Sequence, residues 1–239
     1  MSFFKEFDNL LGANDEDDWT RAFFAHSNRL GFDFCLYGTI PHVKSPLDCA
    51  WVRSSFPKEW LERYFGRGYI AQDYKLIHCM NGNLPLIWSP DVFLRPEQRR
   101  IYDEGCDFGL RAGISLPAHG PDGIYGQLCL AKNVEPGYEF NEFLASRMHS
   151  ILQLRDILAH SSRSFAYPGR ELMQHPLTVR EKECLRWVAT GKSSKQIAEL
   201  MQCTTSTVNF HISNARRKLG AKSRQAAIAM AIQRGQLLI

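Results

Sequence analysis

The stretch that decides the fold reads Leu-Thr-Val-Arg-Glu-Lys-Glu-Cys-Leu-Arg-Trp-Val-Ala-Thr-Gly over residues 177–191 and Thr-Thr-Ser-Thr-Val-Asn-Phe-His-Ile-Ser-Asn-Ala-Arg-Arg-Lys-Leu-Gly over residues 204–220. Thr178 can cap a helix with its hydroxyl, and Glu181, three residues later, completes a capping box. Because glycine commonly follows the last turn of a helix, this helix is expected to end at Gly191.

The second and third helices of this stretch are predicted to form a helix-turn-helix. The second is expected to start at Ser193 or Ser194 and to run through Met201, and Thr205 or Ser206 is expected to cap the third. At about 100° per residue, the third helix gathers its apolar side chains on one narrow stripe, which consists of Val208, Ile212, Ala215 and Leu219. This stripe must pack on the first two helices, so the opposite face points outward, as a helix in the major groove of DNA requires.

Polar and basic side chains cover that outward face. Asn209 can pair with an adenine edge, Phe210 can contact a thymine methyl group, and the Arg and Lys side chains can fix the register on phosphates. We therefore expect DNA contacts from Lys195, Ser206, Thr207, Asn209, Phe210, Ser213, Asn214, Arg216, Arg217 and Lys218. The competing interpretation is a solvated basic helix of a protein–protein domain, which would leave Phe210 in water without a use.

Charge separates this module from the rest of the chain. Residues 176–239 hold eleven Lys and Arg against three Glu, a net charge of +8, and the preceding residues hold 18 basic against 22 acidic side chains, a net charge of −4. A basic module behind an acidic one indicates a DNA reader attached to a domain that controls it. We expect domains at 1–165 and 176–239, joined by a polar linker at 166–175.

Composition excludes several classes of protein. Apolar residues make up 44 % and charged residues 23 % of the chain, which is ordinary for a globular protein, and no uncharged run approaches the roughly 18 residues of a membrane span. The seven cysteines show no Cys-x-x-Cys pair and no zinc-like spacing with His. We therefore expect reduced thiols, no metal, no cofactor, no membrane partner and a cytoplasmic protein. No Cys or His stands in a nucleophile motif, which argues against an enzyme.

The first 165 residues alternate helical and strand-like segments. Asp15 can cap the first long helix, and the clearest strand signal is a hairpin whose arms, 112–118 and 124–130, flank Gly120-Pro121-Asp122-Gly123. Further elements are expected as a strand at 32–40 and helices at 57–66 and 139–160. The prediction is an α+β chain, with an N-terminal α-β-α sandwich sensor domain and a C-terminal all-α, four-helix helix-turn-helix domain.

The basic module resembles the LuxR-type DNA-binding domain. Glu181, Leu185 and Gly191 match the hallmark Glu, Leu and Gly of that family, and the resemblance spans the whole module. It implies a fourth helix, at about 222–234, that helps to pair two such modules. The dimer-face candidates that follow are Ala227, Met230 and Ala231.

Residues 1–165 resemble the autoinducer-binding domain of LuxR-family quorum-sensing regulators, on the strength of Pro57, Trp60, Tyr64, Asp73, Trp88 and Gly113. The resemblance implies that Trp60 donates its indole N–H to the lactone carbonyl of an acyl-homoserine lactone, and that Asp73 accepts the N–H of the ligand amide. Such a ligand would supply the donor that a buried carboxylate needs and the acceptor that a buried indole N–H needs. The other ligand contacts expected are Leu36, Gly38, Phe56, Tyr64, Tyr74, Trp88, Phe93, Ile101, Leu110, Ser115 and Cys129.

Three positions depart from the family pattern. Tyr74 stands where the family commonly has Pro, Phe56 where several receptors have Tyr, and Cys129 where some have a hydroxyl residue. Two hydrogen bonds to the ligand amide carbonyl, each contributing about 0.5–1.5 kcal/mol, are thus expected to be missing or weakened, which leaves the ligand's identity open. From the residues alone, Trp60 also fits a simple core position and Asp73 a simple N-cap.

The chain is thus predicted to be a ligand-responsive, DNA-binding transcriptional regulator of quorum sensing. It is expected to bind an acyl-homoserine lactone in its first domain and double-stranded DNA as a homodimer paired through the long helix. Inverted-repeat half-sites should lie roughly 10 base pairs apart, and RNA polymerase is a further candidate partner. Two alternatives remain: a receptor for a different small molecule, and a dimer that binds DNA without ligand.

Overall fold

A computed structural model describes residues 5–42, 45–120, 123–168, 177–233 and 236–237. The chain divides into two compact units, the first running to Arg170 and the second from Glu171. The linker expected at 166–175 falls largely outside the described residues, and so do Pro121 and Asp122 of the expected hairpin turn.

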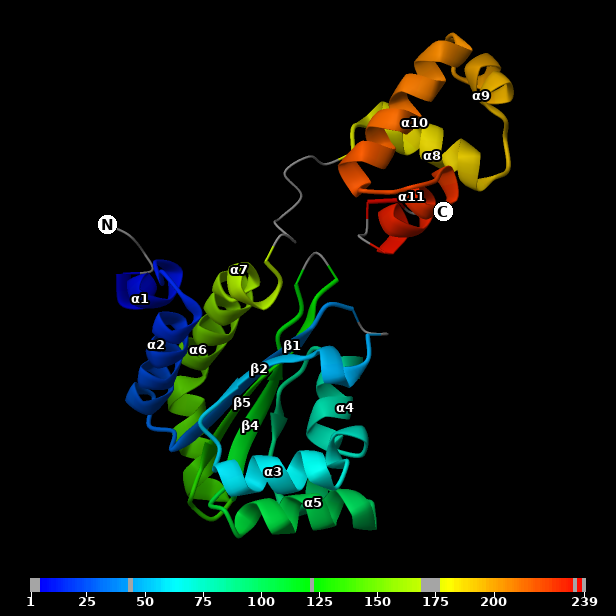
Figure 1. Ribbon diagram of the computed structural model, residues 1–239. Coiled ribbons are helices and arrows are strands. Elements are labelled where there is room, and N and C mark those ends of the chain that lie inside the picture. The colour runs from blue at the N-terminus through cyan, green and yellow to red at the C-terminus, as the bar shows by residue number, and fades with distance from the viewer. Residues whose placement is uncertain (1–4, 43–44, 121–122, 169–176, 234–235, 238–239) are drawn as a thin grey trace. The chain divides into compact units, whose positions relative to one another are not determined.

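A five-stranded antiparallel sheet forms the centre of the first unit (Figure 1). Its strands, in spatial order, are β2 (Trp51–Ser54), β1 (Phe34–Ile40), β5 (Tyr125–Lys132), β4 (Ala112–Pro117) and β3 (Leu86–Ile87). The expected hairpin is confirmed as β4 and β5, in a register that pairs Ala112 with Lys132 and Pro117 with Gln127. In β1 the side chains of Cys35 and Tyr37 are buried on one face of the sheet, and Leu36 and Gly38 alternate with them.

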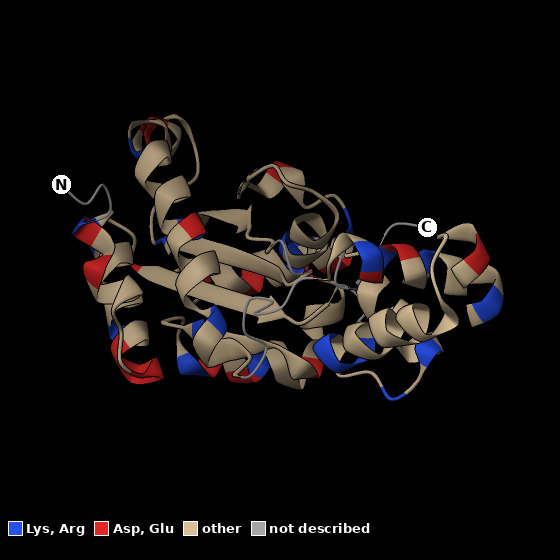
Figure 2. Ribbon diagram, turned by 90° about the horizontal axis from the view of Figure 1, so that it is seen from above, with Lys and Arg blue, Asp and Glu red and all other residues tan. Residues whose placement is uncertain are grey.

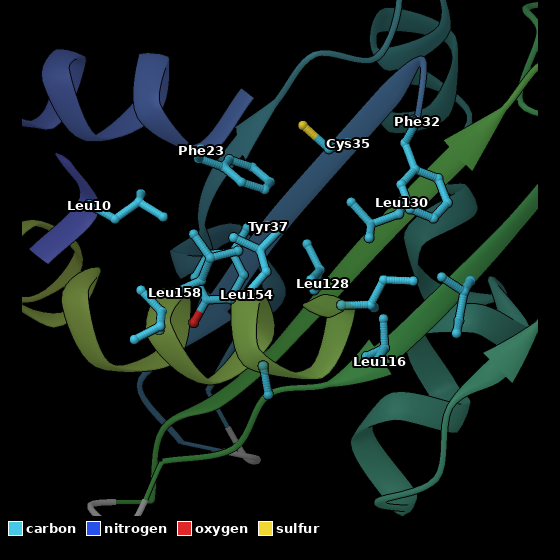
Figure 3. Close-up of a cluster of buried hydrophobic side chains, with 14 of the residues drawn as sticks. Leu10, Phe23, Phe32, Cys35, Tyr37, Leu116, Leu128, Leu130, Leu154 and Leu158 are labelled. Atoms are coloured by element: carbon cyan, nitrogen blue, oxygen red, sulfur yellow. The ribbon is translucent and has the colours of Figure 1, made fainter. Parts of the chain in front are cut away.

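Three helices cover the face of the sheet that Cys35 and Tyr37 point to: α1 (Asp8–Leu11), α2 (Glu16–Arg29) and α6 (Tyr138–Ser161). The side chain of Asp15 caps α2 by accepting the Asp18 N–H at 2.8 Å, as predicted. Between these helices and the sheet lies the larger hydrophobic core, in which Phe23 and Tyr37 contact leucines of α6 and β5 (Figure 3). Its fully buried side chains include Trp19, Leu128 and Leu154.

The opposite face of the sheet carries α3 (Lys58–Gly66), α4 (Tyr74–Asn81) and α5 (Pro96–Cys106). A second apolar cluster, centred on Trp60, Trp88 and Ile101, lies between them and the sheet. Shorter elements connect these layers: the 3-10 turns Lys5–Phe7, Leu47–Cys49, Tyr69–Ala71 and Pro90–Val92, and the helix α7 (Arg163–Ala166). The α-β-α sandwich predicted from the sequence is therefore confirmed.

The second unit is helical, with α8 (Val179–Ala189), α9 (Ser194–Leu200), α10 (Thr205–Leu219) and α11 (Arg224–Gln233). The capping box is confirmed, because the Glu181 N–H donates to Thr178 Oγ1 at 3.2 Å and the Thr178 N–H donates to Glu181 Oε2 at 2.8 Å. The cap of α10 is Thr204, whose hydroxyl accepts the Thr207 N–H at 3.1 Å. The prediction of Thr205 or Ser206 was wrong by one residue.

Two small residues of α11 pack inside this unit. Ala227 and Ala231 are fully buried against Leu185 of α8 and Leu219 of α10. The expectation that they belong to a dimer face is therefore wrong, because a side chain already covered by its own domain has no surface left for a partner. Met230 is half-buried in the same cluster.

Candidate functional site

A cavity of about 100 Å³ opens between the sheet and α3, α4 and α5, several times the roughly 10–15 Å³ that one water molecule requires. Ten of the thirteen predicted ligand contacts line it. They are Leu36, Gly38, Phe56, Trp60, Tyr64, Asp73, Trp88, Ile101, Leu110 and Cys129. Residues far apart in the sequence thus share one predominantly apolar chamber, as a site for a small amphipathic molecule requires.

The other three predicted contacts lie behind this lining. Ser115 is fully buried under Trp88, and Phe93 stacks on Tyr102 with ring centroids 4.8 Å apart. Tyr74 is half-buried and packs edge-on against Phe93 at 6.4 Å. These side chains support the chamber walls and do not face its interior.

Asp73 has two roles in the structure. As the N-cap of α4, it accepts the backbone N–H of Lys75 with Oδ1 at 3.0 Å. Its other oxygen, Oδ2, accepts the hydroxyl of Tyr64 at 3.0 Å inside the chamber. The N-cap interpretation and the ligand-contact interpretation of Asp73 are therefore compatible with one geometry.

The indole N–H of Trp60 is a hydrogen-bond donor without an acceptor among the described residues. Trp60 is buried and lines the cavity, yet its Nε1 has no hydrogen-bond partner among the described residues. Neighbouring Tyr64 stays protonated, because burial and the nearby Asp73 carboxylate raise its pKa well above the usual value.

Ser115 connects two residues of the cavity lining, Trp88 and Cys129. Trp88 Nε1 donates to Ser115 Oγ at 2.8 Å, and the Ser115 hydroxyl lies 3.2 Å from the Cys129 sulfur. Burial raises the pKa of Cys129 to about 12, so its thiol is neutral near pH 7 and is a poor nucleophile.

Lys75 is a charged residue of the cavity lining that the sequence analysis missed. Its ammonium lies 3.2 Å from Asp73 Oδ1, and only 11 % of its side chain is exposed. The sequence carried no signal for this contact, because a lysine in the first turn of a helix can equally extend its ammonium into water.

Two more polar atoms line the cavity away from Asp73. His119 Nδ1 and Gln127 Oε1 are buried, and neither atom has a hydrogen-bond partner among the described residues; both residues belong to the cavity lining. Both residues lie toward the hairpin end of β4 and β5, where Pro117 pairs with Gln127. The cavity therefore has polar groups in two places: around Asp73, and at His119 and Gln127 near the hairpin.

The outward face of α10 is the candidate DNA interface of the second unit. The predicted stripe of Val208, Ile212, Ala215 and Leu219 is buried, which confirms the helix phase. Of the predicted DNA contacts, Lys195, Ser206, Asn209, Phe210, Ser213 and Arg217 are exposed, and Thr207, Asn214, Arg216 and Lys218 are half-buried. The ring of Phe210 is 62 % exposed, an unusual position for an aromatic side chain without a partner.

Some basic side chains of α10 have partners within the unit. Lys218 Nζ lies 2.8 Å from Glu181 Oε2, and the Glu181 carboxylate is only 4 % exposed. Burial raises the pKa of Glu181, but hydrogen bonds from Lys218 and the Thr178 N–H outweigh it and leave the pKa below its usual value. Arg216 donates to the Lys222 carbonyl at 2.7 Å. These contacts hold Lys218 and Arg216 away from the most exposed part of the face, whereas Arg217 remains on it.

Basic residues predominate in the second unit (Figure 2), in agreement with the net charge of +8 over residues 176–239. Within the described ranges, no helix is both long and apolar enough to cross a lipid bilayer. The same ranges hold no group of three or more His, Cys, Asp or Glu side chains placed to bind a metal ion.

Comparisons with known proteins agree with this two-part organisation. Residues 15–162 match the family model of the autoinducer binding domain, and residues 175–231 match that of bacterial regulatory proteins of the luxR family. The transcriptional activator protein AnoR of Acinetobacter nosocomialis is 30 % identical over 95 % of both chains. The HTH-type quorum-sensing regulator RhlR of Pseudomonas aeruginosa is 33 % identical over 87 % of this chain and 84 % of its own. The crystal structure of Escherichia coli SdiA shares the fold, with a TM-score of 0.65, 21 % identity and 92 % of each chain covered.

Proposed function

Because the chain belongs to the LuxR family of bacterial regulators and carries both an autoinducer-binding domain and a DNA-binding domain, we propose that its signal is an acyl-homoserine lactone bound in the cavity of the first unit. The relatives AnoR and RhlR bear the names of a transcriptional activator and a quorum-sensing regulator. The chain itself is a quorum-sensing type of transcriptional regulator, and the bound molecule and its contacts are the proposal.

One observation carries the ligand assignment. Trp60, whose indole N–H has no hydrogen-bond partner among the described residues, and Asp73, a carboxylate, both line the same mostly apolar cavity. A lactone carbonyl would fill the first and an amide N–H would contact the second, while the acyl chain would lie along Leu36, Ile101 and Leu110. Filling the cavity would stabilise the folded unit by RT ln(1 + [L]/Kd).

The proposal extends to DNA and to the partner chain. Ser206, Asn209, Phe210, Ser213 and Arg217 form an outward face on α10 that would enter one major groove. Two copies, paired through α6 of each, would read an inverted repeat. We place such a dimer at promoters in the cytoplasm, in contact with RNA polymerase, since AnoR is named as an activator.

The test is ligand binding by full-length protein and two matched variants. Trp60→Phe removes the unfilled N–H from the cavity. Trp51→Phe removes a different indole N–H, which is buried and has no hydrogen-bond partner in the described part of the chain; Trp51 is not part of the cavity lining. In a thermal-shift titration with a chain-length panel of acyl-homoserine lactones, Trp60→Phe should lose the response and Trp51→Phe should keep it. A wild-type protein that no lactone stabilises would contradict the proposal.

A second candidate function rests on the Asp73 carboxylate. Tyr64, the Lys75 N–H and the Lys75 ammonium already contact it, so the folded unit does not depend on a ligand to satisfy this charge. That arrangement supports, as the second candidate, a regulator that binds DNA without a lactone. Equal yields of soluble protein with and without lactone, together with equal DNA affinity, would favour this function.

A further inference from the structure

The ammonium of Lys75 places a positive charge inside the cavity of the first unit. Its Nζ lies 3.2 Å from Asp73 Oδ1, 5.2 Å from the ring centroid of Trp88 and 5.4 Å from that of Phe93. The lysine side chain is 11 % exposed and lines the cavity. A buried charge is costly unless it is paired and its hydrogen-bonding capacity is filled.

The polar end of the cavity holds more donors than acceptors. A lysine ammonium has three protons, and its partner oxygen among the described residues is Asp73 Oδ1, with which it forms an ion pair. The rings of Trp88 and Phe93 attract the cation without offering a lone pair. Two N–H bonds of Lys75 and the Trp60 N–H are therefore unfilled.

The Asp73 carboxylate has little capacity left to accept hydrogen bonds from a ligand. A carboxylate offers about four lone-pair sites. Asp73 accepts hydrogen bonds from the Tyr64 hydroxyl and the Lys75 backbone N–H, and it also forms an ion pair with the Lys75 ammonium. A ligand can therefore donate one hydrogen bond to Asp73. It should carry several acceptor oxygens for the N–H groups of Lys75 and Trp60.

We propose that Lys75 determines ligand specificity by selecting acyl amides that carry a second carbonyl oxygen on the third acyl carbon. This inference rests on the proposed function, which puts the ligand amide at Asp73. The ammonium beside Asp73 then faces the acyl carbon next to that amide. The amide oxygen and a 3-oxo oxygen can turn to the same side of the chain and share the two free N–H bonds of Lys75.

Other side chains near the ligand amide do not offer this. Phe56 lines the cavity without a hydroxyl, and the Cys129 thiol is a weak donor whose sulfur is already 3.2 Å from Ser115 Oγ. An unsubstituted acyl chain would place a methylene group against the ammonium and leave an N–H unfilled. Hydrogen bonds to charged groups are the stronger ones, so the difference between the two ligands should be large.

The experiment measures Kd for pairs of homoserine lactones that are matched in chain length and differ only in the 3-oxo group. Full-length wild-type protein should bind the 3-oxo member about tenfold more tightly or better. Lys75→Met should abolish that preference, and Lys75→Arg should retain part of it. The matched control is Lys132→Met, since Lys132 also lies over an aromatic ring, that of Phe143 at 5.4 Å, but does not line the cavity.

The outcomes separate the two proposals. Equal wild-type affinity for both members of a pair, or an unchanged preference in Lys75→Met, overturns the role of Lys75 and leaves the proposed function standing. No lactone binding by wild-type protein overturns the proposed function, and the role of Lys75 with it. The wild-type preference needs no variant, so it decides the matter even if Lys75→Met is too unstable to purify.

Discussion

The indole of Trp88 lies directly on the α-carbon of Gly113. A Cβ at position 113 would stand 2.5 Å from Trp88 Cε3 and 2.7 Å from the Leu130 carbonyl oxygen. The backbone N–H of Trp88 also donates to the Gly113 carbonyl at 2.7 Å. The absence of a side chain on β4 therefore sets the position of one wall of the cavity.

Gly113→Ala should lower the stability of the first unit. The added methyl group has no free space, and overpacking of this kind costs about 1–3 kcal/mol. Thermal unfolding of the full-length protein measures the loss. Gly66→Ala is the control, because a Cβ at Gly66 meets nothing within 4 Å. Equal melting temperatures for the two variants would contradict the account of Trp88.

Phe56→Tyr should strengthen the binding of acyl-homoserine lactones. The new hydroxyl would enter the cavity that Phe56 lines and could donate to the ligand amide carbonyl, for about 0.5–1.5 kcal/mol, or roughly two- to tenfold in Kd. Phe108→Tyr is the control, because Phe108 packs on Trp60 at 5.6 Å without lining the cavity. A fall in affinity, or the same change in both variants, would show that position 56 does not face the ligand amide.

His26 should make the first unit sensitive to acid. Burial, together with the neighbouring Arg29, lowers its pKa to about 4, while the unfolded chain takes up a proton near the usual pKa of about 6.5. The stability that neutral His26 contributes is thus present above about pH 6.5 and is lost as the pH falls toward 4.

The melting temperature of His26→Gln should therefore change less than that of wild type between pH 7 and pH 4.5. His149→Gln, at an exposed position of α6, should follow the wild-type curve. If the melting temperatures of wild type and His26→Gln fell in parallel with pH, His26 would not be the cause of the acid sensitivity.

Two neighbouring basic residues of α10 should respond in opposite ways. Arg217→Ala should weaken binding to duplex DNA and reduce its salt dependence, with little change in melting temperature, because Arg217 is exposed. Lys218→Met should lower the stability by about 3–5 kcal/mol, because it leaves the buried Glu181 carboxylate without its ammonium partner. Fluorescence anisotropy at low salt and thermal unfolding separate the two effects. Wild-type DNA affinity in Arg217→Ala would mean that this face of α10 does not bind phosphates.

The features that the sequence predicted are those with a local or periodic signal. The capping box at Thr178, the turn residues 120–123 between two strand-like arms and a 3.6-residue stripe on α10 are visible in order along the chain. The helix phase of α10 followed directly, because Val208 and Ile212 could only face inward. The resemblance based on Trp60, Asp73 and Trp88 led to thirteen predicted contacts, of which ten line one cavity.

The features that were missed depend on where a side chain turns. Lys75 follows an N-cap, and its sequence neighbours do not show that its long side chain folds back to Asp73 rather than outward to water. Lys218 looked like a phosphate contact because Glu181, its partner, stands 37 residues earlier. Among consecutive Thr and Ser residues, only the backbone geometry at Thr204 identifies the cap of α10.

The shared carboxylate of Asp73 joins two properties that are usually separate. The carboxylate that would contact a signal molecule also accepts the backbone N–H of Lys75 in the first turn of α4. A ligand that contacts Asp73 should therefore change the hydrogen-exchange rate of the Lys75 backbone amide. This change is expected even for a ligand that touches α4 only at its first turn.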